Sequence, residues 1–223
     1  MFGFRHCGIL SGFVLTAAPT VQFRYRGGMN IPISKFENFR RRIPEGDDHE
    51  RSVCDRCGWI HYENPRVIAA ALCIEGDQVL LCRRAILPRY GFWTLPGGFM
   101  EMGETAENAA VRESFEEAGA RVAASSLLGV YSIPRIGQVH LVYLTHLNSP
   151  EIVAGTESLE VAMVSLKEIP WDELAFPVNH WTLQDYLSLE GRPPAQPFSV
   201  TPDRLEDRLP PVDCHPDYTL PKS

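Results

Sequence analysis

The sequence predicts an α/β fold in which a mixed sheet lies between two helices. Strand-like runs cover 66–74 and 78–84, and the Glu75-Gly76-Asp77 stretch between them is typical of a hairpin turn. Two further segments, 104–118 and 178–189, have apolar residues at the spacing expected of helices. Strands interleaved with helices are typical of a layered α/β domain.

The remaining elements follow from shorter patterns. The aromatic-rich stretch 91–95 predicts a short strand, and further strands are expected at 126–132, 139–147 and 160–165. After Gly191 the chain is rich in proline, which predicts an extended tail over 191–223 with no core of its own. The folded domain is therefore expected to occupy residues 66–190.

Composition excludes several classes of protein. A hydrophobic content of 44% is enough for a real core, whereas the net charge of −7 disfavours a nucleic-acid-binding surface. No apolar run approaches the roughly 18 residues that a transmembrane helix needs, so no membrane partner is expected. The six cysteines form no disulfide framework, and this favours a reducing compartment such as the cytoplasm.

The first 36 residues differ from the rest in charge. They contain no aspartate or glutamate but carry three arginines and one lysine, and we expect them to be a poorly ordered extension outside the fold. Three explanations compete: a plastid or mitochondrial transit peptide, a weak secretory signal, or an upstream extension with Met29 as the true start. The transit peptide would place the protein in an organelle.

The most informative segment is the acidic helix that follows a glycine-rich turn. Glu113, Glu116 and Glu117 are three and four positions apart, so they project from one face of the helix. Carboxylates gathered in this way need a cation, and Mg²⁺ or Mn²⁺ prefers oxygen ligands of this kind. The Pro96-Gly97-Gly98 turn lets main chain approach a ligand closely. A solvated surface helix is the alternative, and the turn and the helix's apolar side count against it.

This segment resembles the signature of the Nudix hydrolases, G-x5-E-x7-R-E-U-x-E-E-x-G-U, in which U is a bulky aliphatic residue. Ser114 and Ala120 are smaller than the expected aliphatic residues. The fixed positions of the signature, called the box below, hold Gly98, Glu104, Arg112, Glu113, Glu116, Glu117 and Gly119.

The resemblance implies the Nudix α/β/α sandwich and metal-dependent hydrolysis of a diphosphate bridge. Glu113, Glu116 and Glu117 would be the catalytic metal ligands, with the carbonyl of Gly98 as a further ligand for Mg²⁺ or Mn²⁺. Glu104 and Arg112 would form a structural pair that fixes the loop to the helix. Glu160 is our candidate for a late metal ligand or general base, and the alternative is an ordinary carboxylate at a strand edge.

The resemblance extends to the flanking segments 43–66, 80–105 and 155–176, which are similar to zinc-ribbon Nudix hydrolases. That group includes FAD diphosphatases and ADP-ribose pyrophosphatases. We therefore predict cleavage of FAD to FMN and AMP, with ADP-ribose or NADH as alternative dinucleotide-type substrates. A nucleotide-triphosphate sanitiser and a catalytically silent nucleotide sensor are further alternatives, and a homodimer is open. The residues expected to bind substrate are Arg83, Arg84, Trp93, Tyr131 and Arg135.

The segment 43–65 resembles a degenerate zinc ribbon. Cys54-Asp-Arg-Cys57 matches one of its two Cys-x2-Cys pairs, whereas residues 30–42 contain no cysteine or histidine. A structural zinc site needs four ligands. Zinc at Cys54 and Cys57 is therefore not expected, although His49 and His61 offer an alternative way to complete a site.

Overall fold

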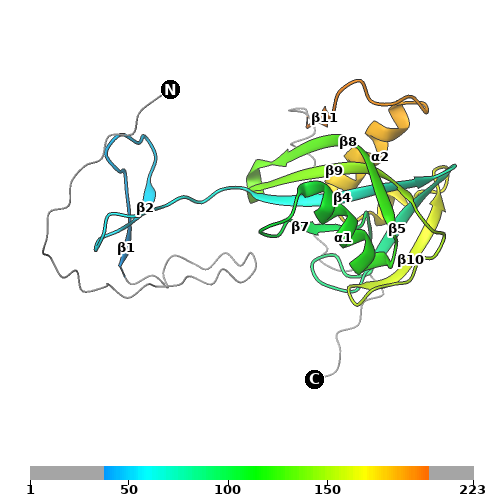
Figure 1. Ribbon diagram of the computed structural model, residues 1–223, viewed down its shortest axis with the longest axis horizontal. Coiled ribbons are helices and arrows are strands. Elements are labelled where there is room, and N and C mark those ends of the chain that lie inside the picture. The colour runs from blue at the N-terminus through cyan, green and yellow to red at the C-terminus, as the bar shows by residue number, and fades with distance from the viewer. Residues whose placement is uncertain (1–37, 201–223) are drawn as a thin grey trace, which may run out of the picture.

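The structure is a computed structural model that describes residues 38–200. The predicted N-terminal extension, 1–36, and residues 201–223 of the predicted tail lie outside this range. Figure 1 shows a small sheet and a larger sandwich, joined by an extended stretch of chain that leads into β4. Within 38–200, no helix is both long enough and apolar enough to span a membrane.

The larger part is built on an eight-stranded sheet. Its strands lie in the order β10-β5-β4-β9-β8-β11, with β6 beside β5 and β7 beside β4. The β4–β9 pair is parallel and the β8–β9 pair is antiparallel, so the sheet is mixed, as predicted. The strands are β4 (Arg66–Glu75), β5 (Gln78–Arg84), β6 (Trp93–Thr94), β7 (Gly97–Phe99), β8 (Val122–Ile133), β9 (Gln138–Leu147), β10 (Ser158–Ser165) and β11 (Phe198–Ser199).

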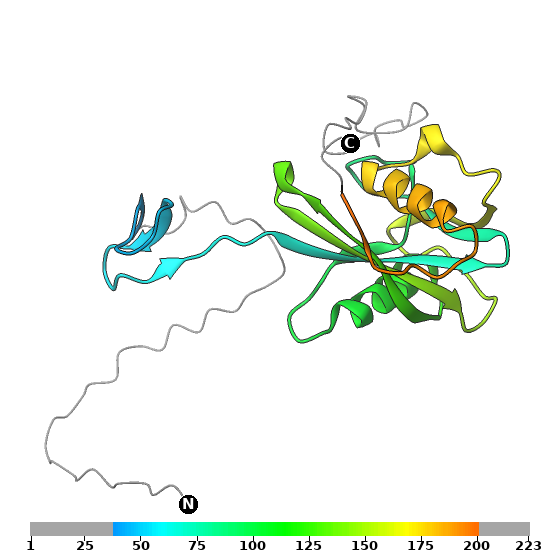
Figure 2. The ribbon, with the colours of Figure 1, turned by 90° about the horizontal axis from the view of Figure 1, so that it is seen from above.

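The two helices cover opposite faces of this sheet. Along β4, Ala69 and Ala71 pack on the side of α1 (Ala106–Ala118). Ala70 and Leu72 belong to the core cluster on the side of α2 (Pro177–Ser188). Figure 2 shows α1 and α2 on either side of the strands. Because alternate residues of a strand point to opposite faces, the apolar run of β4 serves both layers, and the predicted α/β/α sandwich is confirmed.

Local sequence explains where α1 begins and ends. Thr105 caps the start, since its side chain accepts a hydrogen bond from the backbone N–H of Asn108, at 3.2 Å. Gly119 ends the helix in the left-handed conformation, with φ of 60°. Ser114 is fully buried, and its hydroxyl donates to the carbonyl of Ala110 at 2.7 Å, which explains how a small polar residue is accommodated there.

The structure departs from the sequence prediction at its C-terminal end. Within the segment 191–223, which composition marks as a tail without a core, β11 pairs in parallel with β8. Phe198 and Val200 pack against the core cluster of the α2 face. These two apolar residues supply the burial that the surrounding prolines lack, so the folded part extends beyond 190.

The smaller part, called the ribbon below, is a three-stranded antiparallel sheet. It contains β1 (Phe39–Arg42), β2 (Arg51–Cys54) and β3 (Ile60–His61), in that order. The ribbon therefore begins at Phe39, before the predicted boundary at residue 43. Two short 3-10 turns, Pro134–Ile136 and Trp171–Glu173, complete the described elements.

Candidate active site

Arg112 is the centre of the acidic cluster on α1. Its Nη2 and Nε donate to the two oxygens of Glu104, at 2.8 and 3.1 Å, which makes a bidentate pair. Its Nη1 donates to Glu113 at 2.7 Å and to Glu116 at 3.0 Å. Nη2 also donates to the carbonyl of Phe99 at 3.2 Å. One guanidinium therefore joins the glycine-rich loop to the helix and faces the carboxylates expected to bind metal.

Glu117 lies deepest in the cluster. Its side chain is 8% exposed, and Oε2 accepts a hydrogen bond from the N–H of Gly97 at 3.1 Å. Burial raises the pKa of Glu117 from 4.5 to about 7, with a smaller contribution from the nearby charge of Glu113. A carboxyl with a pKa near 7 is only partly ionised at neutral pH, and a bound cation would favour its ionised form.

Glu113 depends on the glycine opposite it. A Cβ added to Gly98 would lie 2.5 Å from Glu113 Oε1, so a larger residue would displace this carboxylate from its position. Burial raises the pKa of Glu113, although the Arg112 guanidinium acts in the opposite direction. Glu116, at 55% side-chain exposure, faces solvent at the rim of the cluster.

The donor set fits a hard divalent cation. Three carboxylates of one helix lie near the Gly98 main chain, and oxygen donors of this kind suit Mg²⁺ or Mn²⁺. The three carboxylates are not gathered tightly: among residues 38–200, only Asp47, Asp48 and His49 bring three ligand atoms within 4.8 Å of one another. Arg112 Nη1 lies between Glu113 and Glu116, where a cation would compete for the same oxygens.

The two arginines expected to bind substrate point to opposite faces of β5. Arg84 lies on the face of α1, where burial lowers its pKa and the charges of Glu117 and Glu157 act against that effect. Arg83 lies on the other face, donates to the carbonyl of Gly91 at 2.9 Å and pairs with Glu160 at 3.7 Å. Only Arg84 is therefore near the acidic cluster.

The position of Glu160 does not agree with its predicted role as a metal ligand or general base. It lies opposite Arg83 in the β10–β5 register, whereas its neighbours Val161 and Met163 pack on the α1 side. Strand alternation therefore turns Glu160 away from the helix, and it is not placed as a metal ligand or a base at the box.

Sequence reasoning missed Glu157, three residues earlier. This exposed carboxylate is close enough to contribute to the raised pKa of both Glu113 and Glu117. Its loop is tied to the end of α1, because the N–H of Gly155 donates to the carbonyl of Glu117 at 3.0 Å. The Gly155–Ser158 stretch was the available signal, but periodicity alone does not say whether Glu157 or the nearby Glu160 faces the helix.

Two aromatic residues expected to bind substrate are part of the core instead. Tyr131 is fully buried, and its hydroxyl donates to Asp185 at 3.0 Å. Trp93 packs against the core cluster of the α2 face and pairs with Leu174 through an isolated bridge. Arg135 lies exposed in the turn Pro134–Ile136. None of the three offers a ring surface beside the box.

A different aromatic residue directly follows Gly98 of the box, with its side chain on the opposite face of β7. This residue, Phe99, is 42% exposed, and the guanidinium of Arg66 lies 5.0 Å from the centre of its ring. An exposed ring beside an arginine is a surface on which a nucleobase can stack. The contact between β4 and β7 creates this pair, so sequence spacing could not reveal it.

The Cys54–Cys57 knuckle keeps its turn but lacks partners for a tetrahedral site. The N–H groups of Cys57 and Arg56 donate to the Cys54 sulfur and lower its pKa. Among residues 38–200, no third histidine, cysteine or carboxylate brings a ligand atom within 4.8 Å of both sulfurs. Two thiols do not meet the need of a structural zinc ion for four ligands, so these residues do not fit the metal.

Two family models match this chain. A model of the NUDIX domain matches residues 64–184, and a model described as Nudix N-terminal matches residues 37–63. The chain is 35% identical over 130 residues to an ADP-ribose pyrophosphatase from Methanocaldococcus jannaschii, which covers 56% of this chain and 75% of that protein. It is 38% identical over 97 residues to a putative 8-oxo-dGTP diphosphatase from Bacillus subtilis, covering 43% and 63%.

A solved structure is similar over a larger share of the chain. The crystal structure of a NUDIX hydrolase from Nitrosomonas europaea has 43% sequence identity and a TM-score of 0.69. The likeness covers 73% of this chain and 93% of that one. The NUDIX model spans more than half of this chain, and the similar solved structure covers nearly three quarters of it.

Proposed function

We propose that this chain, which belongs to the Nudix hydrolase family, hydrolyses the diphosphate bridge of compounds built on adenosine diphosphate. The observation that carries the proposal is the complete box gathered around Arg112, with Glu117 buried beneath it. FAD, cleaved to FMN and AMP, is the substrate favoured by the flanking sequence. ADP-ribose is favoured by the archaeal relative, and NADH shares the same ADP half.

The reaction needs an attacking water in line with a phosphorus atom while negative charge builds on the surrounding oxygens. A divalent cation held by Glu113, Glu116, Glu117 and the Gly98 carbonyl would neutralise that charge. The pairing of Arg112 with Glu104 keeps the glycine-rich loop against the helix, so the donor groups stay together. The protein's own contribution is thus mainly positioning.

We assign proton transfer to Glu157. Its carboxylate is exposed and acts on the pKa of Glu113 and Glu117, whereas Glu117 is covered and its carboxyl would be needed for the cation. The loop carrying Glu157 is fixed to α1 by the hydrogen bond from Gly155 and by a second one, from Val153 N–H to the Ala118 carbonyl at 2.8 Å. A base on a tethered loop can face a phosphate held at the helix.

Recognition of the ADP half would use groups beside the box. Phe99 and Arg66, on the face of the sheet away from α1, offer a ring and a guanidinium to adenine, and Arg84 offers a positive charge on the α1 face. These replace Trp93, Tyr131 and Arg83 of the sequence prediction.

A second candidate function rests on the Bacillus subtilis relative, whose description names 8-oxo-dGTP. Hydrolysis of such a triphosphate would release inorganic pyrophosphate instead of two nucleotide or sugar phosphates. The same box can serve both reactions, so product identity separates them.

The experiment is a product assay on purified protein with FAD, ADP-ribose, NADH and 8-oxo-dGTP, each with Mg²⁺ or Mn²⁺. We expect AMP plus the partner phosphate from at least one ADP compound, in preference to cleavage of the triphosphate. A clear preference for 8-oxo-dGTP would overturn the proposal. Binding of nucleotides without any cleavage would indicate a sensor instead.

A further inference from the structure

The Nudix reaction does not explain what holds the three strands of the ribbon together. In a zinc ribbon the metal crosslinks two knuckles and so holds a very small sheet together. Here only the Cys54–Cys57 knuckle is present within 38–63, and residues 30–37 add no cysteine or histidine to the sequence that leads into β1. Some other set of contacts has to connect the strands.

We infer that the ribbon of this chain holds its three strands without a structural metal ion, by two side-chain clamps that reach from β1 across β2 to β3. One clamp is a pair of aromatic rings at the knuckle end of the sheet. The other is a branched ion pair at the opposite end. The strand register places both on the same face.

The ring clamp joins Phe39 of β1 to Trp59, which directly precedes β3. Phe39 lies opposite Cys54 in the β1–β2 register, and the N–H of Cys54 donates to the carbonyl of Trp59 at 2.8 Å. The two rings meet edge to face, with centroids 5.7 Å apart and planes at 89°. This contact crosses β2 directly over the knuckle, where a metal would otherwise make the connection.

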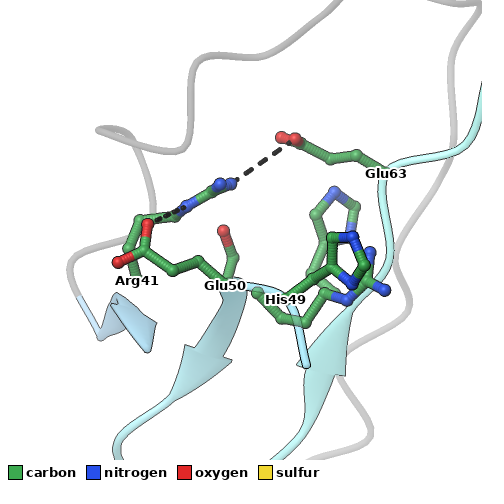
Figure 3. Close-up of a pocket in the computed structure, with 7 residues that line it drawn as sticks. Arg41, His49, Glu50 and Glu63 are labelled. Carbon is green, nitrogen blue, oxygen red and sulfur yellow. Dashed lines mark ion pairs between the residues drawn. The ribbon is translucent and has the colours of Figure 1, made fainter. Parts of the chain in front are cut away.

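The charge clamp starts two residues further along β1. Arg41 lies opposite Ser52, and Ser52 lies opposite His61, so the three form the next row across the sheet. The guanidinium of Arg41 is 3.9 Å from Glu50, which precedes β2, and 3.7 Å from Glu63, which follows β3. Figure 3 shows both ion pairs diverging from this one arginine.

Arg41 and charged neighbours line a small cavity of about 290 Å³ in the ribbon. Arg41 pairs with the two glutamates, and the Nε of Arg51 pairs with Asp47 at 2.9 Å, so the basic groups are matched by acidic ones. A matched set favours a structural role over an anion or cation site. The residues that line the cavity are Arg41, His49, Glu50, Arg51, Ser52, His61 and Glu63.

Further contacts tie β1 to the knuckle without using sulfur. The Nε of Arg40 pairs with Asp55 at 2.5 Å, and the N–H of Asp55 donates to the carbonyl of Asn38 at 2.7 Å. Within the knuckle, the N–H of Gly58 donates to the carbonyl of Cys54 at 2.8 Å. The turn is therefore closed by main-chain hydrogen bonds, and both strands are attached to it.

The test uses the full chain, produced with zinc in the medium and dialysed. Bound zinc is measured by mass spectrometry, and amide hydrogen exchange is followed in peptides from 38–63 with and without chelator. We expect far less than one zinc per chain, and unchanged protection of these peptides after chelation and in the C54S/C57S variant. Stoichiometric zinc, either one per chain or one per two chains, overturns the inference, as does loss of protection after chelation or in C54S/C57S.

The ring clamp is tested by Trp59→Ala and by the milder Phe39→Leu, and the charge clamp by Arg41→Gln, with peptides from the Nudix domain as the internal control. Because an edge-to-face ring pair is a modest interaction, we expect exchange in 38–63 to become up to about tenfold faster. Unchanged exchange in both ring variants overturns the ring clamp, and unchanged exchange in Arg41→Gln overturns the charge clamp. Faster exchange in the Nudix domain as well would show that the effect of the substitutions is not confined to the ribbon.

Discussion

Arg112 in the Nudix domain and Arg41 in the ribbon each pair with more than one carboxylate, yet their surroundings differ. Arg112 and Glu104 are mostly covered and share two hydrogen bonds of 2.8 and 3.1 Å. Arg41 and its two partners are about half exposed, and the nearest atoms are 3.7 to 3.9 Å apart. Exposed pairs of the second kind contribute about 0–1 kcal/mol each, whereas charge-assisted bidentate pairs are considerably stronger.

A sequence motif can bind a metal only where the fold places further ligands and hydrogen-bond partners beside it. The box has Gly97, Gly98 and Arg112 placed against its carboxylates. The Cys54–Cys57 pair keeps one half of its motif, and within 38–200 no further ligand reaches it. The domain should therefore depend on a metal, and the ribbon should not.

The largest expected effect is on catalysis. Glu116→Gln or Glu117→Gln should lower kcat/KM by at least about 100-fold, since even outer-shell losses at metal sites cost 10–100-fold. The fold should remain intact by circular dichroism. Hydrolysis at a near wild-type rate by either variant would show that these glutamates are not metal ligands.

A matched pair tests the reassignment of the base. Glu157→Gln should slow hydrolysis by roughly 100-fold, in the range of a lost general base. Glu160→Gln, on the opposite face of the same strand region, should leave the rate close to wild type. The reverse pattern would restore the assignment that the sequence favoured.

Acid–base behaviour should also separate the two regions. Because burial raises the pKa of Glu117 from 4.5 to about 7, its contribution to stability is full below pH 4.5 and is lost as pH rises through 7. Metal-free protein should lose up to about 3 kcal/mol of unfolding free energy over this window, measured by urea titration. Glu117→Gln should flatten that slope.

The ribbon's Asp47 should respond in the opposite sense. Its hydrogen bond from Arg51 lowers its pKa to about 2, so its contribution is present above pH 3.8 and is lost as pH falls through 2. Arg51→Gln should remove the acid-induced increase in hydrogen exchange of peptides from 38–63. A persistent increase in that variant would mean that another group is responsible.

The smallest effect concerns a buried hydroxyl. Ser52 in β2 is 1% exposed, and its Oγ has no hydrogen-bond partner, so Ser52→Ala should stabilise the ribbon by about 1 kcal/mol. Slower amide exchange in β2 would report this gain. Ser114→Ala is the matched control, because its hydroxyl already donates to the Ala110 carbonyl and its removal should bring no gain.

Much of the fold could be predicted from the sequence because its signals are local. The β4–β5 hairpin, Gly119 at the end of α1 and the spacing of Glu113, Glu116 and Glu117 depend on neighbouring residues only. By contrast, β11 depends on Phe198 reaching a core cluster built from distant strands. No local sequence pattern predicts such a contact.

The substrate-facing residues were harder to predict for a similar reason. Alternate residues of β5 face opposite sides of the sheet, and only the structure shows that Arg84, not Arg83, is on the side of α1. Tyr131 has an aromatic ring that could stack on a base, but the fold buries this ring and its hydroxyl donates to Asp185. Phe99 and Arg66 become neighbours only when β7 pairs with β4.

The central claim is that the box, and not the ribbon, holds the divalent cation. Its most direct test is a titration with Mn²⁺ followed by electron paramagnetic resonance, in wild type, Glu117→Gln and C54S/C57S. We predict that wild type and C54S/C57S bind Mn²⁺ alike and that Glu117→Gln binds it at least about tenfold more weakly. Equal binding by Glu117→Gln, or loss of binding in C54S/C57S, would contradict the account.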